Sequence, residues 1–126
     1  MFSHIDHLVL TVRSLEKTCS FYERVLKFTR SDTSGRPTAL HFGSCKINVH
    51  EMGRTFEPKA SMPTPGSADF CLITEESLDN LSRHLQSEDV EIEIGPVERN
   101  GARGAMTSLY FRDPDGNLIE VSRYSP

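Results

Sequence analysis

The sequence predicts an α+β fold of two βαβββ modules, which form a curved, cavity-enclosing mixed sheet with the helices outside. The order of strand and helix patterns occurs twice along the 126 residues. A segment with three prolines and two glycines, residues 53–66, separates the two copies. The length fits one ordinary domain. We therefore expect a single domain over residues 1–126, with modules at about 1–52 and 67–126.

The first module begins with alternating residues and continues with a helical pattern. In residues 5–12, apolar side chains occupy every second position, which predicts a strand. Ser14 is a typical helix N-cap, and residues 15–26 place apolar side chains at three- and four-residue steps. Three short extended pieces follow, at residues 27–32, 37–43 and 45–52.

The second module repeats this order. We expect a strand at 67–74 and a helix over 75–87, which has a narrow apolar stripe. Residues 90–96 alternate and predict an extended piece. Strands are then expected at 105–111 and 117–124, joined by the sequence Arg-Asp-Pro-Asp-Gly, in which Pro-Asp-Gly favours a turn.

Composition and charge exclude several classes of protein. The formal net charge is −4 and no basic stripe is visible, which argues against nucleic-acid binding. No apolar run approaches the length of a bilayer span, and the first residues do not resemble an export signal. The three cysteines are widely spaced and form no CxxC pair, as in a reduced protein. We expect a small soluble protein of the cytoplasm.

Four polar residues are predicted to share the sheet face that the helices do not cover. Side chains alternate across a strand, which places His7, His50, Asp69 and Glu120 on that face of equivalent strands. Two imidazoles and two carboxylates suit a divalent ion such as Mn, Fe(II), Ni, Zn or Mg. Polar residues on a strand face are also commonly just solvated, so both interpretations stay open at this stage.

Two segments resemble a known superfamily. IDHLVLTV near the start and SLYFRDPDGNLIEVS near the end are similar to the signature strands of the vicinal-oxygen-chelate superfamily, which includes glyoxalases, bleomycin-resistance proteins and extradiol dioxygenases. The resemblance covers essentially the whole chain. KINVHE and FEPKASMPTPGSADFCLIT are similar to the glyoxalase domain-containing protein 5 group. The resemblance implies a glyoxalase-like fold and a homodimer.

The resemblance also implies roles for single residues. His7 matches the metal ligand of the first strand, and Glu120 matches the ligand of the last strand. His50 lies where glyoxalase I enzymes draw a fourth ligand, and Asp69 occupies a ligand position that is usually His. This departure argues against the two-His, one-carboxylate iron site of the extradiol dioxygenases.

Substrate contacts are expected at the other end of the chain. Ser108 and Tyr110 resemble substrate-contacting residues of the fosfomycin-modifying thiol transferases. Residues 95–104 are expected to form a loop at the mouth of the cavity, where Arg99 and Arg103 would meet an anionic group. These residues suggest a small, anionic organic substrate.

Two classes of function compete. The first is a metal-dependent enzyme of the glyoxalase type, a lyase, isomerase or thiol transferase, in which Glu120 moves a proton. The second is a metal-free protein that sequesters a small molecule, as bleomycin-resistance proteins do. A dioxygenase is a further alternative. Membership of a fold family does not decide among them.

Overall fold

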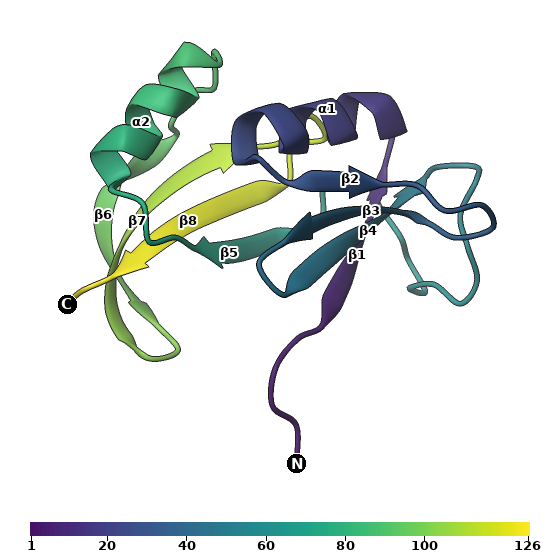
Figure 1. Cartoon of the computed structure of the whole chain (residues 1–126), viewed down its shortest axis with the longest axis horizontal. Helices are drawn as coiled ribbons and strands as arrows, with labels where there is room; N and C mark the ends of the chain where they lie inside the picture. The colour runs from purple at the N-terminus through teal and green to yellow at the C-terminus, as the bar shows by residue number, and fades with distance from the viewer. The chain divides into compact units, whose positions relative to one another are not determined.

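The computed structural model describes all 126 residues, which form two compact units, Met1–Ser67 and Ala68–Pro126. Each unit contains one helix and four strands in the order β-α-β-β-β (Figure 1). The two predicted βαβββ modules are therefore confirmed. The strands form two four-stranded mixed sheets, one in each unit, where a single sheet was expected.

The first unit pairs its first and last strands in parallel. β1 lies beside β4 in parallel, and β3 joins β4 to β2 by antiparallel pairing. A parallel pair requires a crossover, and the helix between β1 and β2 provides part of it. The elements are β1 (His7–Val12), α1 (Leu15–Leu26), β2 (Thr29–Ser31), β3 (Thr38–Phe42) and β4 (Cys45–Glu51).

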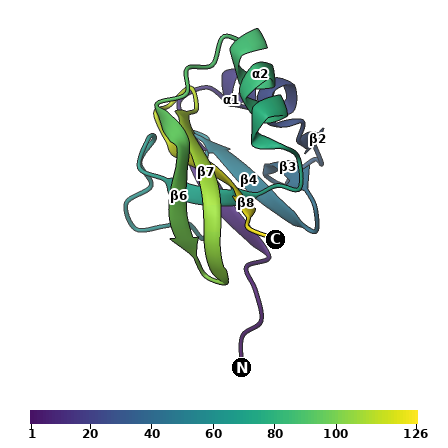
Figure 2. The same ribbon diagram turned by 90° about the vertical axis from the view of Figure 1, so that its left-hand side faces the viewer.

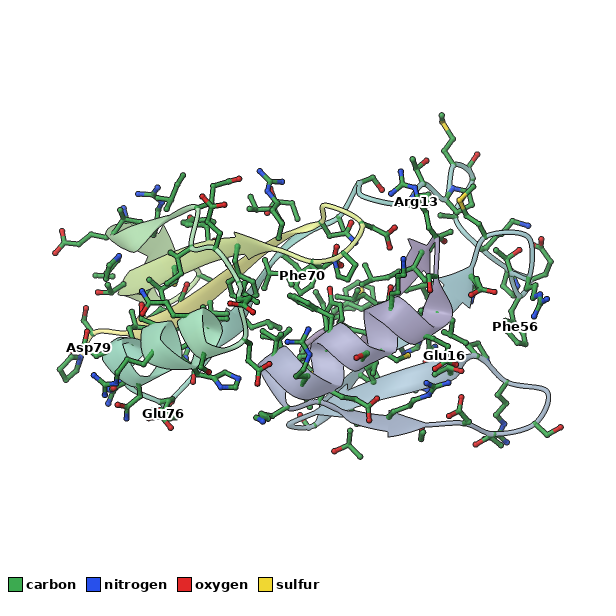
Figure 3. The ribbon with its side chains drawn as sticks, turned by 90° about the horizontal axis from the view of Figure 1, so that it is seen from above. Arg13, Glu16, Phe56, Phe70, Glu76 and Asp79 are labelled. Atoms are coloured by element: carbon green, nitrogen blue, oxygen red, sulfur yellow. The ribbon has the colours of Figure 1, made fainter.

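Local contacts fix α1 at the predicted place. The Ser14 side chain accepts a hydrogen bond from the Lys17 backbone at 3.2 Å and caps the first turn. Lys27 ends the helix in the left-handed conformation, with φ of 62°. Glu16, labelled on the first turn in Figure 3, accepts hydrogen bonds from Arg30 of β2 at 2.8 and 3.0 Å. This ion pair ties the helix to the sheet.

The second unit has the same topology. β5 lies parallel to β8. β7 joins β8 to β6 by antiparallel pairing, and Figure 2 labels these three strands. Apolar side chains on one face of its strands are buried, including Leu109, Phe111, Ile119 and Val121. The elements are β5 (Asp69–Ile73), α2 (Leu78–Ser87), β6 (Ile94–Gly101), β7 (Gly104–Arg112) and β8 (Leu118–Tyr124).

Two element boundaries in the second unit differ from the prediction. α2 begins at Leu78, three residues later than expected, because Ser77 caps it by accepting a hydrogen bond from Asn80. The predicted loop over 95–104 is wrong, since most of it belongs to β6. A register shift between Ile94 and Val97 accommodates Gly95 and Pro96. Proline is tolerated there because β6 is an edge strand.

No helix is long and apolar enough to cross a membrane. The longer of the two, α1, has 12 residues, well short of the roughly 20 that a membrane span needs.

Candidate metal and substrate site

Glu120 lies in the middle of β8, on the face of the second sheet that points away from the buried apolar core. Its register partner on β7 is Tyr110, and its partner on β5 is Cys71. Paired residues on neighbouring strands point to the same face. The flanking residues Ile119 and Val121 are buried on the opposite face. The alternation predicted for this strand is therefore confirmed.

Two buried hydroxyls hold the Glu120 carboxylate. Oε2 accepts hydrogen bonds from Ser108 at 2.7 Å and from Ser122 at 3.1 Å, and the two seryl oxygens lie 2.6 Å apart. Both serines are fully buried. Charge-assisted bonds of this kind fix the orientation of a carboxylate. The other oxygen, Oε1, remains available for an ion or a substrate.

Cys71 extends this network. Its Sγ lies 3.2 Å from the Ser122 hydroxyl oxygen. Either the thiol or the hydroxyl can donate in this contact. Burial raises the pKa of the Cys71 thiol, with the Glu120 charge adding to the effect. The thiol is therefore protonated at neutral pH.

Asp69 is exposed at the start of β5, beside this network. Its register partner is Leu118, two residues before Glu120, so both carboxylates point to the same face. The turn before β8 holds this strand start in place, because the Ala68 N–H donates to the Asn117 side chain at 2.9 Å. The buried side-chain amide of Asn117 thus helps to position Asp69 relative to Glu120.

His7 lies at the start of β1 in the first unit, with a side chain that is 45% exposed. Its Nδ1 is 2.8 Å from an oxygen of Asp6, and the hydrogen bond from His7 lowers the pKa of Asp6. A carboxylate behind Nδ1 is the usual partner of a metal-ligating imidazole, since it fixes the tautomer with Nε2 free.

The structure does not bring His50 to His7. His50 pairs with Thr11, whereas His7 pairs with Lys46, four residues away along β4. At about 3.3 Å per residue, the two histidines are roughly 13 Å apart along the strands. One ion binds its protein ligands at about 2.0–2.2 Å, so the register does not support His50 as a partner of His7.

His50 is instead a buried residue. It is only 3% exposed, and the Phe56 ring centroid lies 5.6 Å from that of His50. Phe56, labelled in Figure 3, belongs to the loop after β4. Its Nδ1 has no hydrogen-bond partner. Burial lowers the pKa of this imidazole, and the nearby Lys59 charge lowers it further. His50 is therefore neutral near pH 7.

Neither unit alone gathers three or more His, Cys, Asp or Glu side chains in a group that could hold a metal ion. Of the four predicted ligands, His7 and His50 belong to the first unit, and Asp69 and Glu120 belong to the second. Within the second unit, the two carboxylates share a face as predicted.

The predicted substrate residues divide into two places. Ser108 and Tyr110 lie on the face of Glu120, and Arg99 Nε donates to the Tyr110 hydroxyl at 3.0 Å. Arg103 lies at the β6–β7 turn, where its guanidinium stacks 4.4 Å from the Tyr124 ring centroid. The structure does not bring Arg103 to Tyr110, because Tyr124 is four residues from Glu120 along β8.

The sequence prediction treated Arg99 only as one of two arginines in a loop. Val97 and Arg99 occupy alternate positions of β6, opposite Ser108 and Met106 of β7, and so lie on the same face of the sheet. This alternation identifies Arg99 only when the strand is continued past Pro96.

A separate groove of about 810 Å³ lies beside the start of α2, and its lining includes Arg103, Arg123, Glu75 and Asp79.

A family model covers nearly all of this architecture. The model of the Glyoxalase/Bleomycin resistance protein/Dioxygenase superfamily matches residues 4–121, a range that includes every element except the end of β8 and every site residue predicted from the sequence. The chain belongs to this superfamily. The resemblance noted from the first and last strands is therefore confirmed.

Several superfamily relatives are similar over the whole chain. Virulence protein STM3117 from Salmonella typhimurium is 49% identical over 124 residues, which covers 98% of this chain and 86% of the relative. Its crystal structure matches the structure of this chain with a TM-score of 0.97, and the match covers 99% of each chain. Glyoxalase domain-containing protein RDO1 from Mycosarcoma maydis is 47% identical over 120 residues, 95% of this chain and 68% of the relative.

A solved integron cassette protein of V. cholerae is 52% identical to this superfamily member. The match has a TM-score of 0.96 and covers 99% of this chain and 98% of the other. These names specify no reaction. The fold and the superfamily are therefore shown, whereas the chemistry has to be argued from the site.

Proposed function

We propose that the protein is a metal-dependent enzyme of the glyoxalase type, with His7, Asp69 and Glu120 as metal ligands. The observation that supports this most strongly is the Glu120 carboxylate, which has one oxygen fixed by two buried hydroxyls and the other free. Solvated surface carboxylates lack such a buried support, whereas metal-ligating carboxylates commonly have one.

The donor set fits a divalent ion. Asp69 and Glu120 supply carboxylate oxygens on one sheet face, and His7 supplies an imidazole whose Nδ1 is already bonded to Asp6. One imidazole and two carboxylates suit Mn, Fe(II) or Mg, and also Zn or Ni. When bound, the ion would act as a Lewis acid that polarises oxygen atoms of the substrate.

A more distant relative supports the thiol-addition part of this proposal, and a further protein shares the fold. Glutathione transferase FosA from Serratia marcescens is 28% identical over 126 residues, 96% of this chain and 81% of the relative. FosX from Listeria monocytogenes has been solved in complex with Mn(II) and sulfate; it is 21% identical, with a TM-score of 0.69. The metal belongs to that protein, and the fold alone is shared.

The chain's own residues would orient the substrate and move a proton. Oε1 is the Glu120 oxygen assigned to the ion, so it would accept a proton from a carbon or hydroxyl of the substrate only after leaving the ion. Tyr110 lies directly opposite Glu120 in register, and its hydroxyl can donate to a substrate oxygen. This arrangement supports isomerase, lyase or thiol-addition chemistry on a small oxygen-chelating molecule.

Metal content provides the test. The protein is purified without chelators or a histidine tag, and bound Mn, Fe, Ni, Zn and Mg are measured by mass spectrometry. We expect near-stoichiometric metal in the wild type and its loss in His7→Ala, Asp69→Asn and Glu120→Gln. His41→Ala is the matched control, because His41 bonds Ser31 on β2 and belongs to no proposed site.

Two outcomes would overturn the proposal. Metal at the wild-type level in both His7→Ala and Glu120→Gln would remove the ligand assignment. Absence of metal from the wild type, even after reconstitution with each ion, would favour the metal-free binding protein instead. The homodimer that we also propose is tested on the same samples by light scattering coupled to gel filtration.

A further inference from the structure

Arg99 and Tyr110 bring a guanidinium and a phenol together on the sheet face that holds Glu120. Arg99 Nε donates to the Tyr110 hydroxyl at 3.0 Å, and the guanidinium carbon lies 5.4 Å from the ring centroid. β6 pairs with β7 so that Arg99 is opposite Met106, which places its side chain on the same face as Ser108. The pair thus lies beside the serine that supports Glu120.

The pair has hydrogen-bond donors left for a ligand. Arg99 uses Nε for Tyr110 and one Nη1 proton for the Glu98 carbonyl at 3.0 Å. A guanidinium has five N–H donors in a planar fork, so Nη2 and the second Nη1 proton remain. The Tyr110 oxygen accepts from Arg99, which leaves its own proton to be donated elsewhere. One positive charge and several N–H and O–H donors therefore remain on the sheet face that holds Glu120.

We propose that Arg99 and Tyr110 bind a carboxylate group of the substrate, which makes the substrate a small organic acid. This assignment rests on the function proposed above, in which other oxygens of the same molecule chelate the metal held by Glu120. Arginine binds carboxylates through two parallel N–H donors, and a phenol adds a third contact.

Charge favours a carboxylate over a phosphate. The same face has the acidic groups of Asp69 and Glu120, and Arg99 is the cation that hydrogen-bonds to Tyr110. One guanidinium compensates a carboxylate monoanion, and the other arginine on this face, Arg112, is already paired with Glu93 at 3.0 Å. Cross-strand partners have Cβ atoms about 5 Å apart, and Tyr110 is the partner of Glu120. A substrate that spans both needs only a few carbon atoms.

The chain contains a matched control for this pair. Arg103 also stacks on a tyrosine, with its guanidinium carbon 4.4 Å from the Tyr124 centroid, and its backbone N–H donates to the Tyr124 hydroxyl at 3.1 Å. Tyr124 is four residues along β8 from Glu120. The two pairs share their chemistry and differ in their distance from the site.

The test observes the arginine side chains directly. Nε–Hε signals of Arg99 and Arg103 are recorded by NMR on metal-free full-length protein, and each is assigned by its loss in Arg99→Lys or Arg103→Lys. Malate is then added, with malamide and inorganic phosphate as comparison ligands. We expect a saturable shift of the Arg99 signal with malate only, and no response of the Arg103 signal.

Two variants give the expected size of the effect. Tyr110→Phe removes one hydrogen bond and should weaken malate binding about tenfold. Arg99→Gln should abolish saturable binding, whereas Arg103→Gln should bind malate like the wild type. Phosphate that shifts the Arg99 signal at lower concentration than malate would overturn the carboxylate assignment. Equal responses of both arginines, or none from Arg99 at tens of millimolar malate, would overturn the subsite.

The two proposals fail in different ways. The NMR titration uses no metal, so a positive result in a protein that takes up no metal would refute the metal ligands and retain the subsite. If the protein takes up metal but its Arg99 NMR signal does not shift with malate, only the Arg99–Tyr110 carboxylate subsite is refuted. In Arg99→Gln, the metal content should equal that of the wild type.

Discussion

Asn117 accepts a hydrogen bond from the Ala68 backbone at 2.9 Å, and this one contact joins the turn before β8 to the start of β5. The Asn117 side chain also donates to Asp113 at 2.8 Å, and its backbone N–H donates to the same carboxylate at 3.0 Å. Asn117 is 1% exposed. Since Asp69 follows Ala68, this buried amide helps to place Asp69 on the face of Glu120.

Replacement of Asn117 by Ala should therefore destabilise the protein. The substitution removes the acceptor of the Ala68 N–H and one donor to Asp113, and loss of such hydrogen bonds costs about 1–3 kcal/mol. Thermal and urea unfolding should both show a lower midpoint. Asn100→Ala, on the exposed β6 strand, is the control and should leave the midpoint unchanged. An unaltered midpoint in Asn117→Ala would show that the turn tolerates loss of the amide.

The sequence was sufficient to predict both modules because their signals are local. Ser14 and the apolar stripe after it mark the exact bounds of α1. The strand face of Ile119 and Val121 follows from alternation alone. β6 could not be bounded in this way, because Gly95 and Pro96 interrupt the alternation and a register shift restores it. That shift depends on pairing with β7, which is not a local property.

The site was predictable only in part, for the same reason. Glu120 and Asp69 were placed on one face by alternation, and their register agrees. His50 was placed on the face of His7, but alternation does not measure distance along a strand, and the pairing separates them by four residues. The support of Glu120 by Ser108 required the register of β7 with β8.

Ser108→Ala should weaken metal binding by Glu120. The hydroxyl donates to Oε2 at 2.7 Å, and its loss frees the carboxylate to rotate. Removal of such an outer partner typically costs 10–100-fold in metal affinity. Calorimetric titration with Mn(II) measures the change, and Ser44→Ala in an exposed turn is the control. Equal affinities of Ser108→Ala and wild type would mean that Ser122 alone holds the carboxylate.

His50 should make the protein less stable in mild acid. Its folded-state pKa is below the ordinary histidine value of 6.5 because the ring is buried. Below about pH 6.5 the unfolded chain therefore binds a proton that the folded chain does not. Stability should fall as the pH decreases from 7 towards 5. His50→Asn should lose this component, measured as the unfolding midpoint at each pH.

The control for this experiment is His41→Asn, which removes an exposed imidazole bonded to Ser31. That variant should keep the same dependence on pH as the wild type. If His50→Asn also keeps it, the acid sensitivity belongs to other groups, and the imidazole is not held neutral by its surroundings.

Alkylation should label Cys71 but not Cys19, and the adduct at Cys71 should prevent metal binding at Glu120. Cys71 is exposed and lies opposite Glu120 in register, whereas Cys19 is fully buried with a pKa raised to about 11. Iodoacetamide should label Cys71 in the native protein, faster as the pH rises because the thiolate reacts. Cys19 should remain unlabelled. Peptide mass spectrometry locates the adducts.

The adduct at Cys71 should abolish metal uptake, because a carboxamidomethyl group would stand beside the only free Glu120 oxygen and would disrupt the contact with Ser122 at 3.2 Å. Cys71→Ser retains a hydroxyl donor at this position, so it should take up metal and resist the reagent. Labelled wild type that still binds stoichiometric metal would mean that the ion lies away from the Cys71 side of Glu120. Asp69 would then be the less plausible ligand, because it belongs to the same strand as Cys71.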